Sequence, residues 1–128
     1  MLDAAAEAAY AYPAVNVSSS QTLNAALQGF AEAESDGIVE LTTGVAAYAS
    51  GATVAEGESG ARALAAFAHE VGREYRVFVA LHTDHCPPDQ VDSFLRPLLA
   101  DSSRRRQRGE PPLFNSHMFD GSSLATGS

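Results

Sequence analysis

The chain has 128 residues, 45% of them hydrophobic and 19% charged, which predicts one globular domain with its own core. Its net charge of −8, from 16 acidic and 8 basic residues, argues against a general binder of nucleic acids or acidic membranes. Every basic residue is Arg, so Schiff-base lysine chemistry and Walker-type phosphate binding by Lys are excluded for this chain.

Targeting signals and cysteine content favour a cytoplasmic protein. Cys86 is the only cysteine, which excludes an intrachain disulfide and fits a reducing compartment. The first residues lack the basic region of a signal peptide, and no apolar run approaches the roughly 20 residues that cross a bilayer. We therefore expect neither a nucleic acid nor a membrane among its partners.

Helix-like and strand-like patterns alternate along the chain. Helices are predicted over 2–9, 20–33, 59–74 and from 87 to the Arg-rich run 104–108, and strands over 12–17, 38–43, 77–81 and 113–116. Pro97 is expected to kink or shorten the last helix, and residues 44–60 read as a long Gly- and Ala-rich connection. This order predicts parallel strands joined by right-handed crossovers.

Polar residues follow every predicted strand, at 16–20, 42–43, 82–85 and 116–120. In barrels and in open α/β sheets alike, the carboxyl edge of the strands carries the active site. The Arg run, in contrast, is read as a solvated helix end in preference to a phosphate or nucleic-acid patch.

The densest group of reactive side chains is His82-Thr83-Asp84-His85-Cys86. His85 is open to three interpretations, a metal ligand, a base or a structural histidine, and Asp84 beside a metal-bound His85 would serve as an acid/base. Successive strand residues point to opposite sides, so both face one pocket only if the strand ends there, as the two prolines that follow suggest. His82 shares a side with Asp84, and Cys86 is expected to be a buried, inert thiol.

A metal site would need further ligands. Zinc takes three or four well-spaced ligands, which this stretch alone does not offer. A second group, His117 and Asp120, is either a capped turn after a strand or support for a site.

Taken together, these stretches resemble the N-terminal part of class II fructose-1,6-bisphosphate aldolases, most closely the longer, dimeric subgroup. The resemblance runs from about Tyr10 to Ser122. It is carried, in order, by Tyr12-Pro13-Ala14-Val15-Asn16, Ser35-Asp36-Gly37-Ile38-Val39, Val79-Ala80-Leu81-His82-Thr83-Asp84-His85-Cys86 and Asn115-Ser116-His117-Met118-Phe119-Asp120-Gly121-Ser122.

The resemblance implies an α/β fold, the N-terminal half of a (β/α)8 TIM barrel with about four parallel strands and crossover helices. Residues 1–128 would form a single partial TIM-barrel domain. It also implies a lyase of glycolysis and gluconeogenesis that uses a divalent metal, usually Zn²⁺. The implied reaction is the reversible cleavage of a phosphorylated sugar, fructose 1,6-bisphosphate, to dihydroxyacetone phosphate and glyceraldehyde 3-phosphate. The resemblance also implies that the full-length protein is a homodimer.

The same resemblance implies roles for individual residues. Asp84 becomes the catalytic acid/base on the aldehyde half of the substrate, and His85 becomes a metal ligand. Asn16 and Thr42 match substrate-contacting positions, with Thr42 standing where a serine is usual. Asp120 matches an acidic residue near the metal. Neither His82 nor His117 is assigned to the catalytic metal.

The sequence also departs from the family pattern. Thr42-Thr43-Gly44-Val45-Ala46 replaces a loop that usually carries two adjacent glycines, and Val cannot adopt positive φ as Gly can. The chain holds about four of eight strands and lacks the family's other metal-binding histidines and its phosphate loop. We therefore expect little aldolase activity from this chain alone. The alternatives are a non-catalytic truncated remnant, a half barrel that pairs with another copy or fragment, and an unrelated α/β binding module in which the cluster is structural.

Overall fold

The structure is a computed structural model, which describes residues 1–125. In chain order its elements are α1 (Leu2–Ala8), β1 (Ala14–Asn16), α2 (Ser20–Glu32), β2 (Gly37–Thr42), α3 (Thr43–Ala49), α4 (Gly57–Gly72), β3 (Val79–Cys86), the 3₁₀ turn η1 (Pro88–Gln90), the π-helical turn η2 (Val91–Leu95), α5 (Arg96–Gln107) and β4 (Ser116–Phe119).

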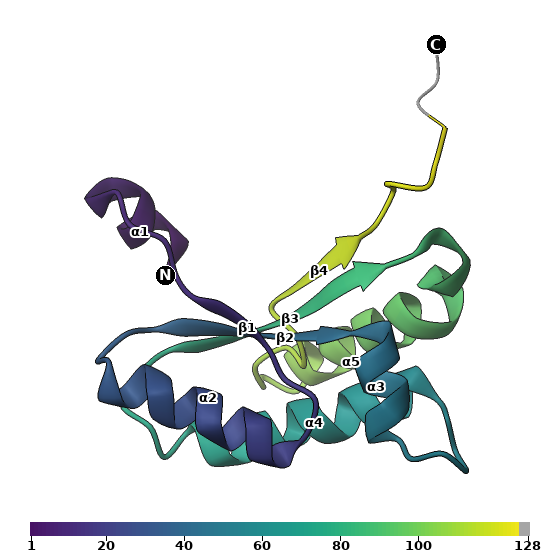
Figure 1. Ribbon diagram of the computed structural model, residues 1–128, viewed down its shortest axis with the longest axis horizontal. Helices are drawn as coiled ribbons and strands as arrows, with labels where there is room; N and C mark the ends of the chain where they lie inside the picture. The colour runs from purple at the N-terminus through teal and green to yellow at the C-terminus, as the bar shows by residue number, and fades with distance from the viewer. Residues whose placement is uncertain (126–128) are drawn as a thin grey trace.

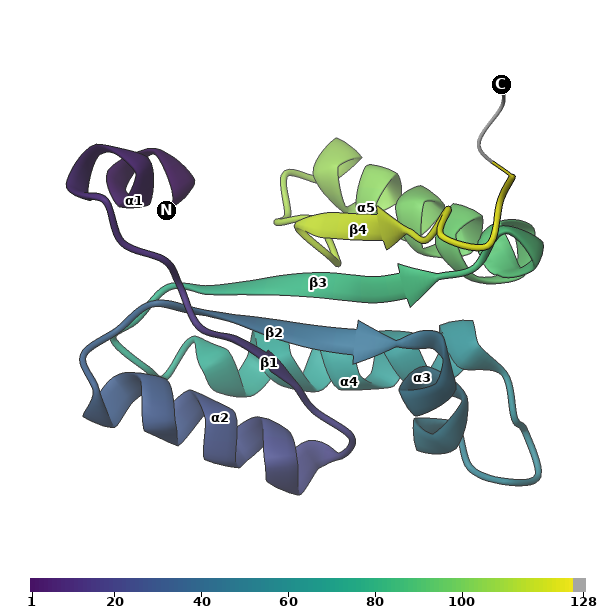
Figure 2. The ribbon, with the colours of Figure 1, turned by 45° about the horizontal axis from the view of Figure 1, so that its top comes forward.

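The strands form one parallel sheet in the order β1-β2-β3-β4, which confirms the predicted parallel topology. Helices α2 and α4 cover one side of this sheet, and α1 lies on the other (Figures 1 and 2). A doubly wound sheet reverses its strand order and carries helices on both faces. Strands that follow one another in sequence order, with their crossover helices in one layer, are instead the arrangement of a barrel segment.

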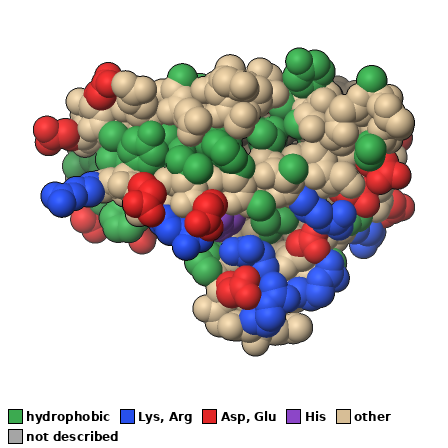
Figure 3. All heavy atoms as spheres, turned by 90° about the horizontal axis from the view of Figure 1, so that it is seen from below, with side chains coloured by type: hydrophobic (Ala, Val, Ile, Leu, Met, Phe, Trp, Pro, Cys, Tyr) green, Lys and Arg blue, Asp and Glu red, His purple; other side chains and the backbone are tan. Residues whose placement is uncertain are grey.

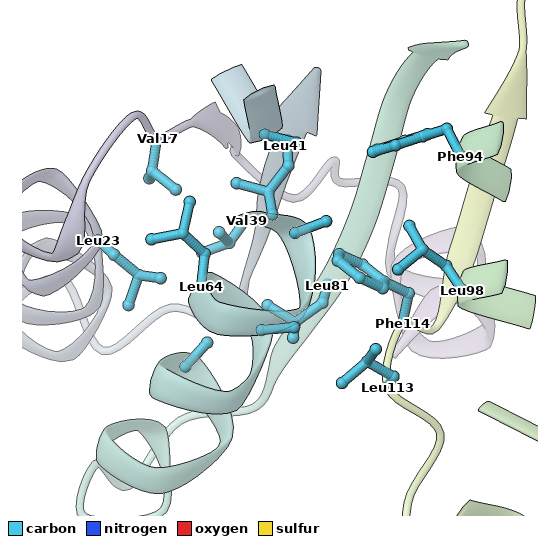
Figure 4. Close-up of a cluster of buried hydrophobic side chains, with 14 of the residues drawn as sticks. Val17, Leu23, Val39, Leu41, Leu64, Leu81, Phe94, Leu98, Leu113 and Phe114 are labelled. Carbon is cyan, nitrogen blue, oxygen red and sulfur yellow. The ribbon is translucent and has the colours of Figure 1, made fainter. Parts of the chain in front are cut away.

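The core lies between the sheet and this helical layer. Strand β2 alternates strictly between buried and half-buried residues, so Val39 and Leu41 point to the helices and Glu40 to the opposite, inner side. Leu23 and Leu27 of α2 meet them, as the helical spacing predicts. Figure 4 shows the strand and helix side chains converging from both layers.

Residues 44–60 are not the long structureless connection that the sequence predicts. Thr42 caps α3 by accepting a hydrogen bond from the Val45 amide at 3.2 Å, so the helix starts as soon as β2 ends. Helix α3 packs tightly on α4 at Gly60, where a Cβ atom would lie 1.8 Å from the Ala46 carbonyl oxygen. Val45, which stands in a segment where the family usually has two adjacent glycines, is helical and does not need a positive φ.

The helix after β3 begins later than predicted. Pro97 lies in the first turn of α5, where its missing N–H costs no helical hydrogen bond, and the residues before it form η1 and η2. Leu98 is completely buried, whereas Leu99 is 51% exposed.

The predicted strand 113–116 is mostly a buried loop, and β4 begins only at Ser116. The Leu113 and Phe114 amides both donate to the buried Ser102 hydroxyl, at 3.1 and 3.4 Å. The His69 Nε2 atom lies 3.0 Å from the Leu113 carbonyl oxygen. Side chains of α4 and α5 therefore take the place of a neighbouring strand.

Replacing Ser102 by Ala should lower the free energy of unfolding by about 1–3 kcal/mol, because two buried amides lose their acceptor. Urea titration followed by circular dichroism measures this loss. Ser103→Ala, the exposed neighbour on the same helix, is the control and should stay within about 0.5 kcal/mol of the parent chain. Equal effects of the two changes would contradict this role for Ser102.

The Arg run at the end of α5 lies among acidic residues. Arg104 pairs with Asp101, and Arg105 and Arg108 lie 3.7 and 2.8 Å from Glu110. On the face seen in Figure 3, the Arg side chains are interspersed with Asp and Glu. This agrees with a solvated helix end. Among the described residues, no helix is both long and apolar enough to cross a membrane.

Candidate functional site

The polar residues that follow the strands meet on the inner side of the sheet. Because parallel strands in register place equivalent residues side by side, the pairing aligns side chains across the sheet. One row consists of Asn16, Glu40, His82 and Ser116, and the next row, nearer the carboxyl edge, contains Thr42 and Asp84.

The sequence predicts that strand β3 ends at residue 81, before the His-rich stretch. In the structure, β3 continues through Cys86. Thr83 pairs with His117 and Cys86 with Phe119, so β3 carries one more residue than β4 over this interval. His85 adopts a left-handed φ of 47°, which is uncommon for a residue other than glycine. Such a bulge re-aims side chains beside a site. It brings His85 next to Asp84 without the strand having to end.

The ring of His85 lies between two carboxylates. Its Nδ1 atom is 3.1 Å from Asp120 Oδ2, and its Nε2 atom is 3.6 Å from Asp84 Oδ1. The hydrogen bond to Asp120 and the charge of Asp84 raise the pKa of His85 above its ordinary value. Hydrogen bonds from the Ser122 hydroxyl and amide, together with His85, lower the pKa of Asp120 to about 2. Asp120 therefore stays ionised and holds the imidazole in place.

An NMR titration of the metal-free chain should find the pKa of His85 above about 6.5 and that of His117 below it, because burial disfavours the charged His117 ring. Asp120→Asn should move the pKa of His85 back toward 6.5. Since the folded-state pKa is raised, this interaction stabilises the fold fully below about pH 6.5 and is lost as the pH rises through the raised pKa. An unchanged His85 titration in the variant would contradict the pairing.

The predicted substrate-contacting residues adjoin Asp84. The Asn16 side-chain amide donates to Asp84 Oδ2 at 3.3 Å. This hydrogen bond links β1 to β3 over the intervening strand β2 and holds the carboxylate in place. Thr42 is the register partner of Asp84 on β2. Its hydroxyl oxygen accepts the α3 cap bond, so its proton is left to donate to a ligand. The five site residues predicted from the family resemblance therefore lie together in the structure: Asn16, Thr42, Asp84, His85 and Asp120.

The other histidines of the motifs are bonded to hydroxyl groups of neighbouring strands. His82 Nδ1 is 2.7 Å from the Ser116 hydroxyl, and His117 Nδ1 is 2.7 Å from the Thr83 hydroxyl on the opposite side of the sheet. Cys86 is fully buried, and burial raises the pKa of its thiol, as expected for an inert cysteine.

Glu40 lies in the same group of side chains, and the sequence interpretation missed it. Its carboxylate, a His82 ring nitrogen and an Asp84 oxygen all lie within 4.8 Å of one another, and all three residues are half-buried. The signal was present in the alternation of β2, which places Glu40 on the same side as Thr42.

The residues around His85 fit part of a divalent-metal centre. A metal-bound histidine generally gives its second ring nitrogen to a carboxylate, as His85 Nδ1 does with Asp120, which leaves Nε2 for the metal. Asp84 adds negative charge at the same point. Catalytic zinc, however, takes three protein ligands, so a complete centre needs imidazole or carboxylate groups beyond these.

Comparison with known proteins gives one consistent result. The sequence profile described as fructose-bisphosphate aldolase class-II matches residues 1–127. The chain is 57% identical over 124 residues to the fructose-bisphosphate aldolase of Corynebacterium glutamicum, a match that covers 97% of this chain and 36% of that protein. It is 58% identical over 122 residues to the enzyme of Streptomyces galbus, covering 95% and 36% of the two sequences.

Among solved structures, the fructose-bisphosphate aldolase of Campylobacter jejuni superposes with a TM-score of 0.86 at 30% identity, covering 92% of this chain and 34% of that one. The predicted fold, half of a (β/α)8 barrel, is thereby confirmed. The chain spans about a third of the length of the relatives it matches.

Proposed function

The chain belongs to the class II fructose-bisphosphate aldolase family, and from that premise we propose that it supplies the first part of the active site of a metal-dependent lyase. The substrate of that enzyme is fructose 1,6-bisphosphate, cleaved reversibly to dihydroxyacetone phosphate and glyceraldehyde 3-phosphate. The observation that carries the proposal is the placement of Asp84 and His85 side by side, with Asp120 behind the imidazole. A homodimeric assembly and a cytoplasmic location in glycolysis belong to the same proposal.

In this function Asp84 moves the proton. Cleavage of the sugar between its third and fourth carbons requires loss of the proton from the hydroxyl on the fourth carbon, and a half-buried carboxylate is suited to accept it. Asn16 holds Asp84 Oδ2, so Oδ1 is the oxygen directed toward His85 and the reacting group. Asn16 and Thr42, which flank Asp84, are the proposed substrate contacts.

His85 holds the divalent metal in this proposal, with zinc as the metal that we infer. When bound, the metal supplies Lewis-acid stabilisation of the negative charge that develops on the dihydroxyacetone half, as the family's chemistry requires without a lysine. His85 keeps Nε2 directed to the metal because Asp120 fixes Nδ1. The left-handed backbone at His85 is the strained feature that maintains this arrangement.

The chain by itself should lack measurable activity, because one histidine and nearby carboxylates do not complete a zinc site. The test joins residues 1–125 to the remaining part of the Corynebacterium glutamicum relative, hereafter the fusion protein. The fusion protein should cleave fructose 1,6-bisphosphate, and a chelator should abolish the reaction. A folded, metal-loaded fusion protein without activity would overturn the proposal, and chelator-sensitive cleavage by the isolated chain would overturn the incomplete-site part of it.

A second candidate function is a non-catalytic half barrel that pairs with another copy. Within the described residues, β1 and β4 each pair with one neighbour only, so both edges have free backbone groups. Sedimentation velocity of the isolated chain tests this pairing: a concentration-dependent dimer is expected if the half barrels pair, and a single monomeric species would contradict it.

A further inference from the structure

A second group of donor atoms lies on the inner side of the sheet, in the row of Thr42 and the row below it. Glu40 and His82 are register partners on β2 and β3, and Asp84 follows His82 by two residues on the same face. Each offers one ligand atom, and these atoms lie within 4.8 Å of one another. Donors that bind one divalent cation lie roughly 4–5 Å apart at most, since metal–ligand distances are about 2.0–2.5 Å.

The histidine of this group is held by the protein in the manner of a metal ligand. His82 Nδ1 is 2.7 Å from the Ser116 hydroxyl on β4, so this nitrogen is engaged and Nε2 is the remaining donor. The Ser116 contact comes from a third strand and fixes the ring independently of Glu40 and Asp84. His82 is thus oriented before any ligand arrives.

Glu40 has no positively charged partner among the described residues, and the only one beside Asp84 is the His85 ring. Within the described part of the chain, Glu40 makes no side-chain hydrogen bond or ion pair, and Asp84 contacts only Asn16 and His85. Like charges placed side by side on half-buried residues oppose folding unless a cation neutralises them. An oriented imidazole between two such carboxylates is a donor set for a first-row divalent transition metal.

We infer that Glu40, His82 and Asp84 form a binding site for such a cation, separate from the position offered by His85 Nε2. Asp84 borders both positions, because its side chain belongs to the donor group and its Oδ1 atom lies 3.6 Å from His85 Nε2. The inference goes beyond the proposed aldolase function, because neither Glu40 nor His82 has a role there. It is tested on the isolated chain, so its outcome does not depend on whether the fusion protein is active.

The experiment titrates the 128-residue chain with Co²⁺, following its visible absorption and the heat of binding. We expect one cobalt ion per chain. Glu40→Gln, which keeps the shape of the side chain, and His82→Gln should each weaken binding at least about tenfold, the minimum expected when even an outer contact of a metal site is lost. His85→Gln should not weaken binding, because it removes a positive charge beside Asp84, and Glu7→Gln on α1 should leave the affinity unchanged.

Three results would overturn the inference: no cobalt binding by the parent chain, parent-like binding by Glu40→Gln and His82→Gln, or a loss confined to His85→Gln. Circular dichroism of each variant checks that the fold is kept. If His82→Gln fails to fold, the cobalt affinity of Glu40→Gln alone tests the site, because this substitution removes a charge but no packing volume.

Discussion

In the fusion protein, Asp84→Asn lowers kcat for cleavage of fructose 1,6-bisphosphate about 10²- to 10⁴-fold, the usual contribution of a positioned acid/base. The amide keeps the hydrogen bond of Asn16 within reach but cannot accept the substrate proton. KM should change much less than kcat, because the lost interaction belongs to the transition state. Steady-state kinetics at fixed metal concentration measure both constants.

The control is Asp92→Asn, an equivalent change at a carboxylate on η2 whose side chain is 85% exposed. Its kcat should stay within about twofold of the parent, since it removes only a surface ion pair. An Asp84→Asn fusion protein that retains more than a tenth of the parent kcat would assign the cluster a structural role, as expected for an unrelated α/β binding module.

Leu98→Ala destabilises the isolated chain by about 2–5 kcal/mol, because the side chain is completely buried where α5 meets the core. A domain of this size has a total stability of only about 5–15 kcal/mol, so much of it should be lost. Urea titration gives the change in unfolding free energy.

The neighbouring Leu99→Ala provides the matched comparison. Leu99 is 51% exposed on the same helix, and its truncation should cost less than about 1 kcal/mol. Comparable losses at the two positions would show that α5 does not pack on the sheet through Leu98.

The local hydrophobic pattern was sufficient to predict those elements in which buried residues recur at one regular spacing. Helix α2 buries Leu23, Leu27 and Phe30 at the spacing that the sequence shows, and Ser19 caps it with a reciprocal hydrogen bond to Thr22. The parallel order of the strands followed from their alternation with helices.

Features that depend on tertiary contacts were beyond local pattern. Helix α3 is only seven residues long and is stabilised by its contact with α4 at Gly60, a residue where the predicted connection 44–60 and the predicted helix 59–74 overlap. The extension of β3 through Cys86 follows from its pairing with β4. In the same way, Leu113 and Phe114 read as the start of a strand by composition but are held by Ser102 and His69.

The candidate site could also be predicted only in part. Resemblance to the family pointed to Asp84 and His85 as candidate site residues, whereas strand alternation alone predicted that their side chains face opposite sides of the sheet. The bulge that reconciles the two requires a left-handed residue at His85, and no propensity favours histidine in that conformation strongly enough to predict it. Alternation places Glu40 on the side of Thr42, but its closeness to His82 depends on the register between β2 and β3, which only the assembled sheet reveals.

Anomalous diffraction from crystals of the zinc-loaded fusion protein, recorded at the zinc absorption edge, tests the proposed site most directly. We expect a zinc peak about 2.0–2.1 Å from His85 Nε2, with Nδ1 still bonded to Asp120. A fully occupied zinc ion bound elsewhere, with the His85 ring turned away from it, would contradict the assignment of His85 as the metal ligand of this segment.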